Sequence, residues 1–403
     1  MLPEDWKKRS VAEVCRSVSV GVVIKPSQYY VSASEGIKAF RSANVKEGQV
    51  NNSDWVYFSH KGHNENKKSE LKTGDVLVVR TGYPGTACVV TPQYAGCNAI
   101  DVVIARPDIQ KIIPTYLCLF TNSEYGKSQV ANLQGGMAQK HLNVGAYQQV
   151  EIPLPPLPEQ KKIAAILSTW DRAIDGTEKL LANSQQQKKA LMQQLLTGKK
   201  RLSGFTGEWK KVSLEKTGKI VSGGTPDTTV PAYWDGDVLW LTPTDVTSLR
   251  GKYVDDTKRK ITQTGIKDSS TILLPVGSLL VCTRATIGYM AIAKKPITTN
   301  QGFKNIVFNK LFLPEFVYYF LCTQKHEIQR LASGSTFAEI SKKDFGKIHI
   351  SAPLLPEQKA IAAVLTTADE ELAALESDLA RLRQEKKALM QQLLTGKRRV
   401  TVD

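Results

Sequence analysis

The segment near the C-terminus has a regular spacing of apolar positions. From residue 361 to residue 382 the apolar side chains recur in alternating steps of four and three, which is the a/d pattern of a coiled coil. The segment that starts at residue 163 follows the same pattern less regularly. Both segments carry a proline suited to a first helical turn and a glycine suited to a stop: Pro158 with Gly198, and Pro356 with Gly396. The pattern predicts two helices of about 40 residues, each about 60 Å long.

The two helical segments are copies of each other. Residues 157–202 align without a gap to residues 355–400, and 28 of 46 positions are identical. The run KKALMQQLLTGK occurs at 188–199 and again at 386–397. Weaker matches extend upstream, as between GDVLVVRTGYPG (74–85) and GSLLVCTRATIG (277–288). The chain is therefore an internal duplication, and it divides into a first block (1–153), a first helical spacer (154–201), a second block (202–351) and a second spacer (352–403).

The blocks have the pattern of α/β (α+β) domains. Short apolar runs such as 75–80, 97–105, 237–241 and 288–293 alternate with clusters of Gly, Pro, Asn and Asp, which is typical of strands and turns. Helical patterns follow a proline at 114–133 and at 314–332. Each block is large enough to form its own core.

The long helices need a partner, because one exposed apolar stripe does not stabilise an isolated helix. The first helix leaves the first block and arrives at the second. The second helix can therefore pair with it most simply by running back antiparallel. We expect a rod with a block at each end and pseudo-two-fold symmetry; the alternative is that each helix docks on its own block.

The charge balance indicates the kind of partner. The 403 residues include 54 Lys and Arg against 38 Asp and Glu, a net charge of +16, and the surplus lies mostly in the two blocks. A polyanion is the expected partner, nucleic acid before membrane. Apolar stretches fall far short of the roughly 18 residues of a membrane helix, and the N-terminus MLPEDWKKRS has no apolar signal core. We therefore expect a cytoplasmic protein.

Motifs that occur in the same order in both repeats carry a family resemblance. LPLPPLPEQKKIAAILS and APLLPEQKAIAAVL open the helices, and KKALMQQLLTGK closes both. The blocks contain GIKAFRSANV (36–45), AQKHLNVGAYQQVEIPLPPL (138–157), SGGTPDTTVPAYWDGDVLWLTPTDV (222–246) and NQGFKNI (300–306). Over essentially its whole length the chain resembles the DNA-specificity subunit of type I restriction-modification systems. The first block departs from the SGGTP form and has VGVVIKPSQYYV at 20–31 instead.

This resemblance implies a bacterial or archaeal DNA-recognition subunit. Each block would be a target-recognition domain that reads one half of a split, asymmetric DNA target. The helices would set the gap and dock two methyltransferase subunits, and motor-nuclease subunits would join to cut unmodified DNA. S-adenosylmethionine, ATP and Mg²⁺ would belong to the partner subunits, with no cofactor in this chain. The alternative is a free-standing DNA-binding regulator or a structural coiled-coil protein.

The sequence predicts neither a catalytic site nor a metal site. The Pro-Pro pair at 155–156 lacks the rest of an (N/D)PP(Y/F/W) methyltransferase loop, and Thr121 stands where a P-loop needs its first glycine. Asp54, Glu65 and Lys67 imitate a nuclease constellation in a chain that is rich in charge. The six cysteines form no CxxC pair, which favours buried free thiols.

Polar residues at strand-to-turn junctions are the candidates for DNA contacts. Arg and Lys suit guanine and phosphate, Asn and Gln suit adenine, and hydroxyl or aromatic side chains suit either groove contacts or shape. In the first block the candidates are Arg41, Asn44, Arg80, Tyr83, Gln139 and Lys140. In the second block they are Thr225, Thr242, Asp245, Arg284, Thr286, Asn300, Gln301 and Lys304. For the helices we expect exposed apolar residues at the KKALMQQLL ends to bind partner subunits, namely Leu195 and Leu393.

Overall fold

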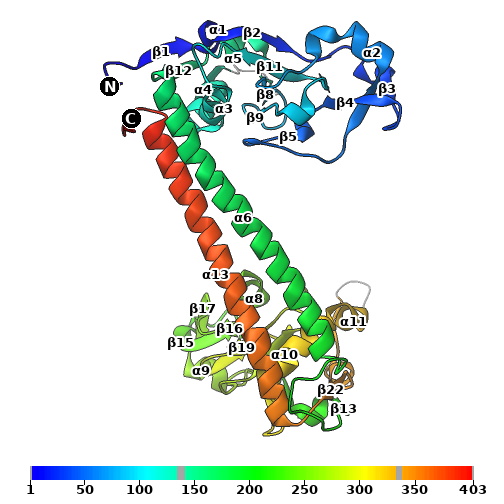
Figure 1. The fold of residues 1–403 in the computed structure, drawn as a ribbon. Helices are drawn as coiled ribbons and strands as arrows, with labels where there is room; N and C mark the ends of the chain where they lie inside the picture. The colour runs from blue at the N-terminus through cyan, green and yellow to red at the C-terminus, as the bar shows by residue number, and fades with distance from the viewer. Residues whose placement is uncertain (1, 134–140, 333–337, 402–403) are drawn as a thin grey trace. The chain divides into compact units, whose positions relative to one another are not determined.

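The chain forms two compact units, each with one block and one segment of each long helix (Figure 1). The computed structural model describes residues 2–133, 141–332 and 338–401. Unit 1 comprises Met1–Glu178 and Asp378–Asp403, and unit 2 comprises Lys179–Ser377.

Unit 1 contains two four-stranded sheets, with strand orders β2-β11-β8-β9 and β10-β4-β7-β3, and two strand pairs, β1-β12 and β5-β6. The strands are β1 (Lys7–Ser10), β2 (Cys15–Val20), β3 (Tyr30–Val31), β4 (Gly36–Phe40), β5 (Val45–Lys46), β6 (Gln49–Val50), β7 (Val56–Ser59), β8 (Val76–Val79), β9 (Ala87–Val89), β10 (Asn98–Ala99), β11 (Val102–Pro107) and β12 (Glu151–Leu154). The short helices are α1 (Val11–Val14), α2 (His60–Glu65), α3 (Pro114–Asn122), α4 (Glu124–Leu133) and α5 (Val144–Gln148).

Unit 2 has a related plan, with a five-stranded sheet of order β14-β21-β18-β19-β16, a three-stranded sheet of order β17-β15-β20 and the pair β13-β22. The strands are β13 (Lys210–Ser213), β14 (Gly218–Ser222), β15 (Trp234–Leu241), β16 (Tyr253–Val254), β17 (Arg259–Ile261), β18 (Leu279–Cys282), β19 (Met290–Ala293), β20 (Ile297–Thr299), β21 (Phe303–Phe308) and β22 (His349–Ala352). The helices are α7 (Leu214–Thr217), α8 (Pro243–Ser248), α9 (Gln263–Lys267), α10 (Pro314–Thr323), α11 (Lys325–Arg330) and α12 (Lys342–Gly346). The predicted mixture of helices and strands in two tandem blocks is confirmed.

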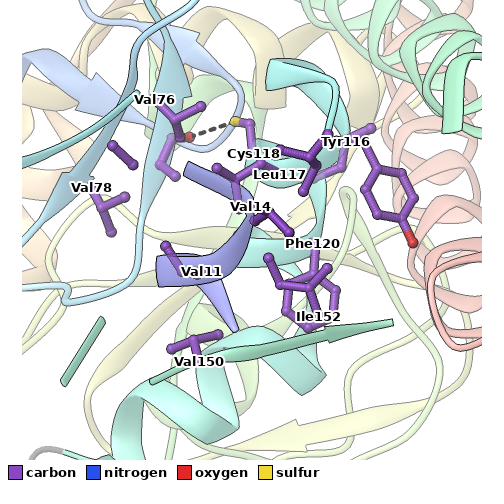
Figure 2. Packing of buried hydrophobic residues seen from close by; sticks show 14 of the residues in the cluster. Val11, Val14, Val76, Val78, Tyr116, Leu117, Cys118, Phe120, Val150 and Ile152 are labelled. Carbon is purple, nitrogen blue, oxygen red and sulfur yellow. Dashed lines mark hydrogen bonds between the residues drawn. The ribbon is translucent and has the colours of Figure 1, made fainter. Parts of the chain in front are cut away.

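The central strand of each block is buried on both faces. Successive side chains of a strand point to opposite sides, so Val76 and Val78 of β8 join one core and Leu77 and Val79 join another. Figure 2 shows the first of these cores, where the Sγ of Cys118 donates to the carbonyl oxygen of Ala87 over 3.4 Å. The strand β18 alternates in the same way between two cores. Burial on both faces explains why these strands read as continuous apolar runs.

The two long helices, α6 (Leu157–Leu195) and α13 (Leu355–Leu393), are each continuous (Figure 1). All seven apolar positions predicted for the α13 seam between residues 361 and 382 are buried or half-buried. A buried glutamine lies near the start of each helix and accepts a hydrogen bond from the preceding block. Gln160 accepts the backbone N–H of Ile113, and Gln358 accepts that of Leu313, each over 2.9 Å. Beyond each helix the stop glycine has a positive φ, +69° at Gly198 and +72° at Gly396, a conformation that favours glycine.

Within each unit the helix segments run antiparallel. In unit 1, Asp171 of α6 pairs with Lys386 of α13, and Glu178 of α6 pairs with Arg383 of α13. Residue numbers thus increase along α6 where those of the α13 partners decrease. In unit 2, Ser184 and Lys188 of α6 pair with Glu371 and Asp369 of α13 in the same sense. The antiparallel pairing is therefore confirmed inside each unit. The alternative, in which each helix docks on its own block, also holds in part, because the first turns of each helix pack on the core of the block that precedes it.

Candidate nucleic-acid interface

Each block presents one surface turn after its central strand. Turn 1 comprises residues 80–86 after β8, and turn 2 comprises residues 283–289 after β18. The same backbone hydrogen bonds hold both turns: Gly85 N to Val79 O (3.1 Å) and Leu142 N to Arg80 O (2.9 Å) in unit 1, and Gly288 N to Cys282 O (3.0 Å) and Ile340 N to Thr283 O (3.0 Å) in unit 2. The two turns therefore share a backbone fold and differ in their side chains.

Turn 1 carries an exposed aromatic side chain. Tyr83 is 84% exposed, and it lies at a hollow of about 320 Å³ that is also lined by Ser42, Lys46, Thr81 and Thr86. An ammonium group, several hydroxyls and an aromatic ring thus surround one concave surface, together with the carboxylate of Glu47, which pairs with Lys127. This combination of groups suits contact with a nucleic-acid backbone and base edges.

Arg80 lies beneath turn 1 and holds it in place. Its side chain is buried, and its guanidinium donates to the carbonyl oxygen of Leu142 (3.1 Å) and to Asp101 (2.5 Å). It also contacts Nε2 of His141 at 2.5 Å. Because arginine only donates, this Nε2 is assigned as the acceptor, and Nδ1–H then donates to the hydroxyl of Thr81 over 3.0 Å. The geometry gives Arg80 a structural role, and the exposure expected of a base-reading side chain is absent.

Two predicted DNA contacts, Asn44 and Asp245, are buried at the third position of a short helix, where each bonds back to the residue that caps the helix. The Asn44 amide oxygen accepts the backbone N–H of Arg41 over 3.0 Å, and the Asp245 carboxylate accepts that of Thr242 over 2.9 Å. Side chains that cap at this spacing are a known pattern, so the sequence did contain the signal. Both side chains lie below the surface, which disfavours base contacts by Asn44 and Asp245. Arg41 itself is half-buried and donates to Asp54 over 2.8 Å.

In the second block, Thr225 and Gln301 meet at the surface. The Thr225 hydroxyl donates to Oε1 of Gln301, and the neighbouring Asn300 accepts the backbone N–H of Gly302 over 3.0 Å. The SGG sequence allows this approach, since a Cβ at Gly223 would lie 1.8 Å from the carbonyl oxygen of Asn300. Gly21 meets the same demand in the first block, where a Cβ would lie 2.4 Å from a backbone oxygen of Ala99. The departure from SGGTP thus keeps the glycine that packing requires.

The remaining candidates of the second block divide between surface and interior. Arg284 and Thr286 are half-buried on turn 2. Lys304 is buried and donates to Glu339 over 3.1 Å. Lys304 therefore has the same supporting role as Arg80, and its burial disfavours a DNA contact in the same way. Gln139 and Lys140 of the first block lie outside the described residues.

The predicted partner-binding leucines are not on the surface. Leu195 is 1% exposed and Leu393 is 2% exposed. Leu195 belongs to the core of unit 2 and Leu393 to that of unit 1. The prediction of exposed apolar side chains here was wrong, because the KKALMQQLL ends pack on the blocks themselves.

The structure also offers candidates that we did not predict from the sequence. The guanidinium of Arg259 lies 3.8 Å from the ring centroid of Trp234 and 5.2 Å from that of Trp240. In the first block, the ammonium of Lys38 lies 5.0 Å from the ring of Trp55. Stacking on aromatic rings orients such cations. The pairs arise from strand neighbours such as Trp240 and Arg259, so sequence spacing alone gives no signal for them.

Reactive groups are scarce in the structure. Within residues 2–133, 141–332 and 338–401, no cluster of three or more His, Cys, Asp or Glu side chains is placed to hold a metal ion. The described cysteines are free, and burial raises the pKa of the Cys88 and Cys282 thiols to about 12. Both thiols therefore stay protonated near neutral pH. In the described part of the chain, no helix combines the length and apolar character needed to cross a membrane.

The comparisons of this chain with known proteins agree on one family. The model of the type I restriction modification DNA specificity domain matches residues 3–183 and 206–382. A putative type I restriction enzyme MjaX specificity subunit from Methanocaldococcus jannaschii is 26% identical over 430 residues, covering 99% of this chain and 95% of that protein. The MjaIX specificity subunit of the same organism is 36% identical over 165 residues, which are 40% of this chain and 38% of that protein.

A solved structure supports the fold. The crystal structure of a type I restriction-modification S subunit from M. genitalium matches with a TM-score of 0.60 at 14% identity, covering 98% of both chains. The family model covers most of both repeats. The chain therefore belongs to the type I restriction-modification DNA-specificity family, the non-catalytic proteins that supply sequence-specific DNA recognition in these systems.

Proposed function

We propose that this chain reads a split, asymmetric DNA target, one half with each block, 1–153 and 202–351. The main support for this proposal is that turn 1 and turn 2 have the same backbone hydrogen bonds but different side chains. Tyr83 of turn 1 corresponds to Thr286 of turn 2, and Thr81 corresponds to Arg284. Two turns of equal shape and different chemistry suit two different base sequences. Family membership disfavours the free-standing regulator.

The proposed DNA contacts are the candidates that lie at or near the surface, together with those outside the described residues. In the first block these are Arg41, Tyr83, Gln139 and Lys140, and in the second Thr225, Thr242, Arg284, Thr286, Asn300 and Gln301. Arg259 and Lys38 are added, because stacked cations keep their N–H donors in a fixed direction. Backbone phosphates and base edges accept such donors.

The helical spacers, 154–201 and 352–403, are proposed to set the gap between the half-sites and to dock two methyltransferase subunits. Motor-nuclease subunits would join this core to restrict unmodified DNA. In this scheme the partners bind S-adenosylmethionine, ATP and Mg²⁺. The support for this role is that α6 and α13 are each unbroken and each include residues of both units.

The test is to express the chain with its own methyltransferase subunit and to map methylated bases by sequencing. We expect one motif with two specific halves and a gap of fixed length. Gel filtration should show this chain eluting with two copies of the methyltransferase subunit. An undivided motif, or no methylation by an assembled complex, would contradict the proposal.

A further inference from the structure

Several side chains tie each block to the helix pair of its own unit, and one of them in each block follows a turn glycine. Gly48 (φ +70°) precedes Gln49, and Gly251 (φ +94°) precedes Lys252. In unit 1 the Gln49 amide donates to Asp175 of α6 over 2.6 Å. In unit 2 the Lys252 ammonium donates to Asp369 of α13 over 3.2 Å. The two blocks are thus tied to the helices at corresponding places.

The tie in unit 2 is buried. Lys252 is 6% exposed, and its ammonium also donates to the Tyr319 hydroxyl over 3.0 Å. The same ammonium lies 5.1 Å and 5.3 Å from the ring centroids of Tyr253 and Tyr319. A charge that is removed from water persists only with such partners. This ammonium therefore has one well-defined position.

Asp369 connects three elements at this point. Its carboxylate accepts from Lys188 of α6 and from the Tyr319 hydroxyl of α10, as well as from Lys252. Burial acts to raise the pKa of Asp369, but the hydrogen bonds from Lys188 and Tyr319 and the charges of both lysines outweigh it, so the pKa lies below its ordinary value. The carboxylate is therefore ionised at neutral pH. The block, α6 and α13 meet in one ionic cluster.

The corresponding place in unit 1 is open. Asp171 and Lys386 form the equivalent helix pair, but the sixth residue of α3 is Leu119 where α10 has Tyr319. A groove of about 790 Å³ lies here, and Gln49, Asp171 and Lys386 are among its lining residues. The hydrogen bond of Gln49 lies at the surface, and so do the contacts of Glu124 in α4 with Lys387 and Gln391 of α13. Water competes with all of these contacts.

We propose that Lys252 is a positioning residue, which fixes the second block rigidly on the helix pair, whereas the exposed contacts of Gln49 and Glu124 hold the first block more loosely. The inference rests on the proposed reading of a split target, since a block that tilts on the helices displaces its half-site. One base step is about 3.4 Å. A small tilt of the block on the helices therefore lets it contact a half-site whose gap is one base pair longer or shorter. Lys252 then contributes to selection of the gap without contacting a base.

The experiment compares three variants, each expressed with the methyltransferase subunit: Lys252→Met, Lys252→Arg and, as the matched control in unit 1, Gln49→Met. Lys252→Met keeps the length of the side chain and removes its charge, while Asp369 retains Lys188 and Tyr319 as partners. Methylation sequencing then gives the gap lengths, and thermal unfolding reports whether each variant is folded.

For Lys252→Met we expect methylation at sites whose gap differs by one base pair to rise by about tenfold, which corresponds to about 1.4 kcal/mol. The sequences of both half-sites should stay unchanged. Lys252→Arg should stay close to the wild type, because it restores a cation that can reach the carboxylate. Gln49→Met should leave the gap as it was.

A folded Lys252→Met variant with the wild-type gap would overturn the inference, and so would a Gln49→Met variant that relaxes the gap equally. If Lys252→Met does not fold, Tyr319→Phe takes its place with the same expectation, because it removes only the hydroxyl from the cluster. A wild-type complex that methylates no split motif would instead contradict the proposed function.

Discussion

Tyr83 is a side chain whose exposure has no structural explanation within its block. It stands at the hollow beside turn 1 and is 84% exposed. We expect Tyr83→Ala to weaken binding of the methyltransferase complex to its target by about 1–3 kcal/mol, the value of one good base contact, and to relax only the half-site read by the first block. Titration of the complex with labelled target DNA measures this. Ile109→Ala, which alters an exposed apolar residue elsewhere in the block, should leave binding unchanged.

Leu195 and Leu393 occupy equivalent buried positions in the two cores. Replacing either with alanine removes packed methyl groups and leaves a cavity. We expect Leu195→Ala and Leu393→Ala each to lower the free energy of unfolding by about 2–5 kcal/mol, as measured by urea unfolding. Unaltered stability combined with loss of the methyltransferase subunit would instead favour an exposed, partner-binding role for these side chains.

Asp369 makes stability depend on pH in a defined direction. Its folded-state pKa lies below the ordinary value, so its carboxylate stabilises the folded state above about pH 4, the unfolded pKa range. This stabilisation is lost as pH falls through the lower folded pKa. Urea unfolding of wild type and Asp369→Asn should therefore differ most near neutral pH, and the difference should shrink below about pH 4. A difference that grows on acidification would contradict the assignment.

At the scale of elements, the long helices could be predicted because their signals are local. The heptad spacing, the first-turn prolines and the stop glycines all lie within the segments concerned. The strand orders β2-β11-β8-β9 and β14-β21-β18-β19 could not be predicted, because they join residues far apart in the chain. For the same reason the buried roles of Arg80 and Lys304 were missed: their partners Asp101 and Glu339 lie 21 and 35 residues away.

The gap set by the helices can be tested by lengthening both. Inserting one heptad after Glu178 in α6 and one after Ser377 in α13 keeps the apolar seam and lengthens each helix by about 10 Å. At about 3.4 Å per base step we expect the gap to widen by about two to three base pairs, with both half-sites unchanged. The added base pairs also rotate one half-site by about 100°, which DNA twisting or bending of the helices must absorb. Methylation sequencing that shows an active complex with an unchanged gap would contradict the prediction.

At the scale of the whole molecule, the net charge of +16 leads us to expect a strong electrostatic contribution to DNA binding. Residues 1–150 carry 17 basic and 12 acidic side chains, and residues 202–350 carry 20 and 13, so the surplus is +5 in one block and +7 in the other. Phosphate contacts by these blocks release counterions, and the affinity of the assembled methyltransferase for its target should fall steeply as salt rises. Titrations from low to physiological ionic strength measure the slope. An affinity that does not change with salt would count against phosphate contacts by these blocks.

The division into units also sets an order of events during synthesis. Unit 2 is one unbroken stretch, Lys179–Ser377, whereas the core of unit 1 includes Leu393 and Leu394 near the other end of the chain. The first block therefore leaves the ribosome early. The helical segment that completes its core, which begins at residue 378, is synthesised only after about 200 further residues, or roughly 10 to 40 s of translation. Unit 2 completes its core first, although its synthesis starts later. We therefore expect the nascent first block to spend longest with an unfilled apolar surface, and to be the part of the chain that a chaperone protects during translation.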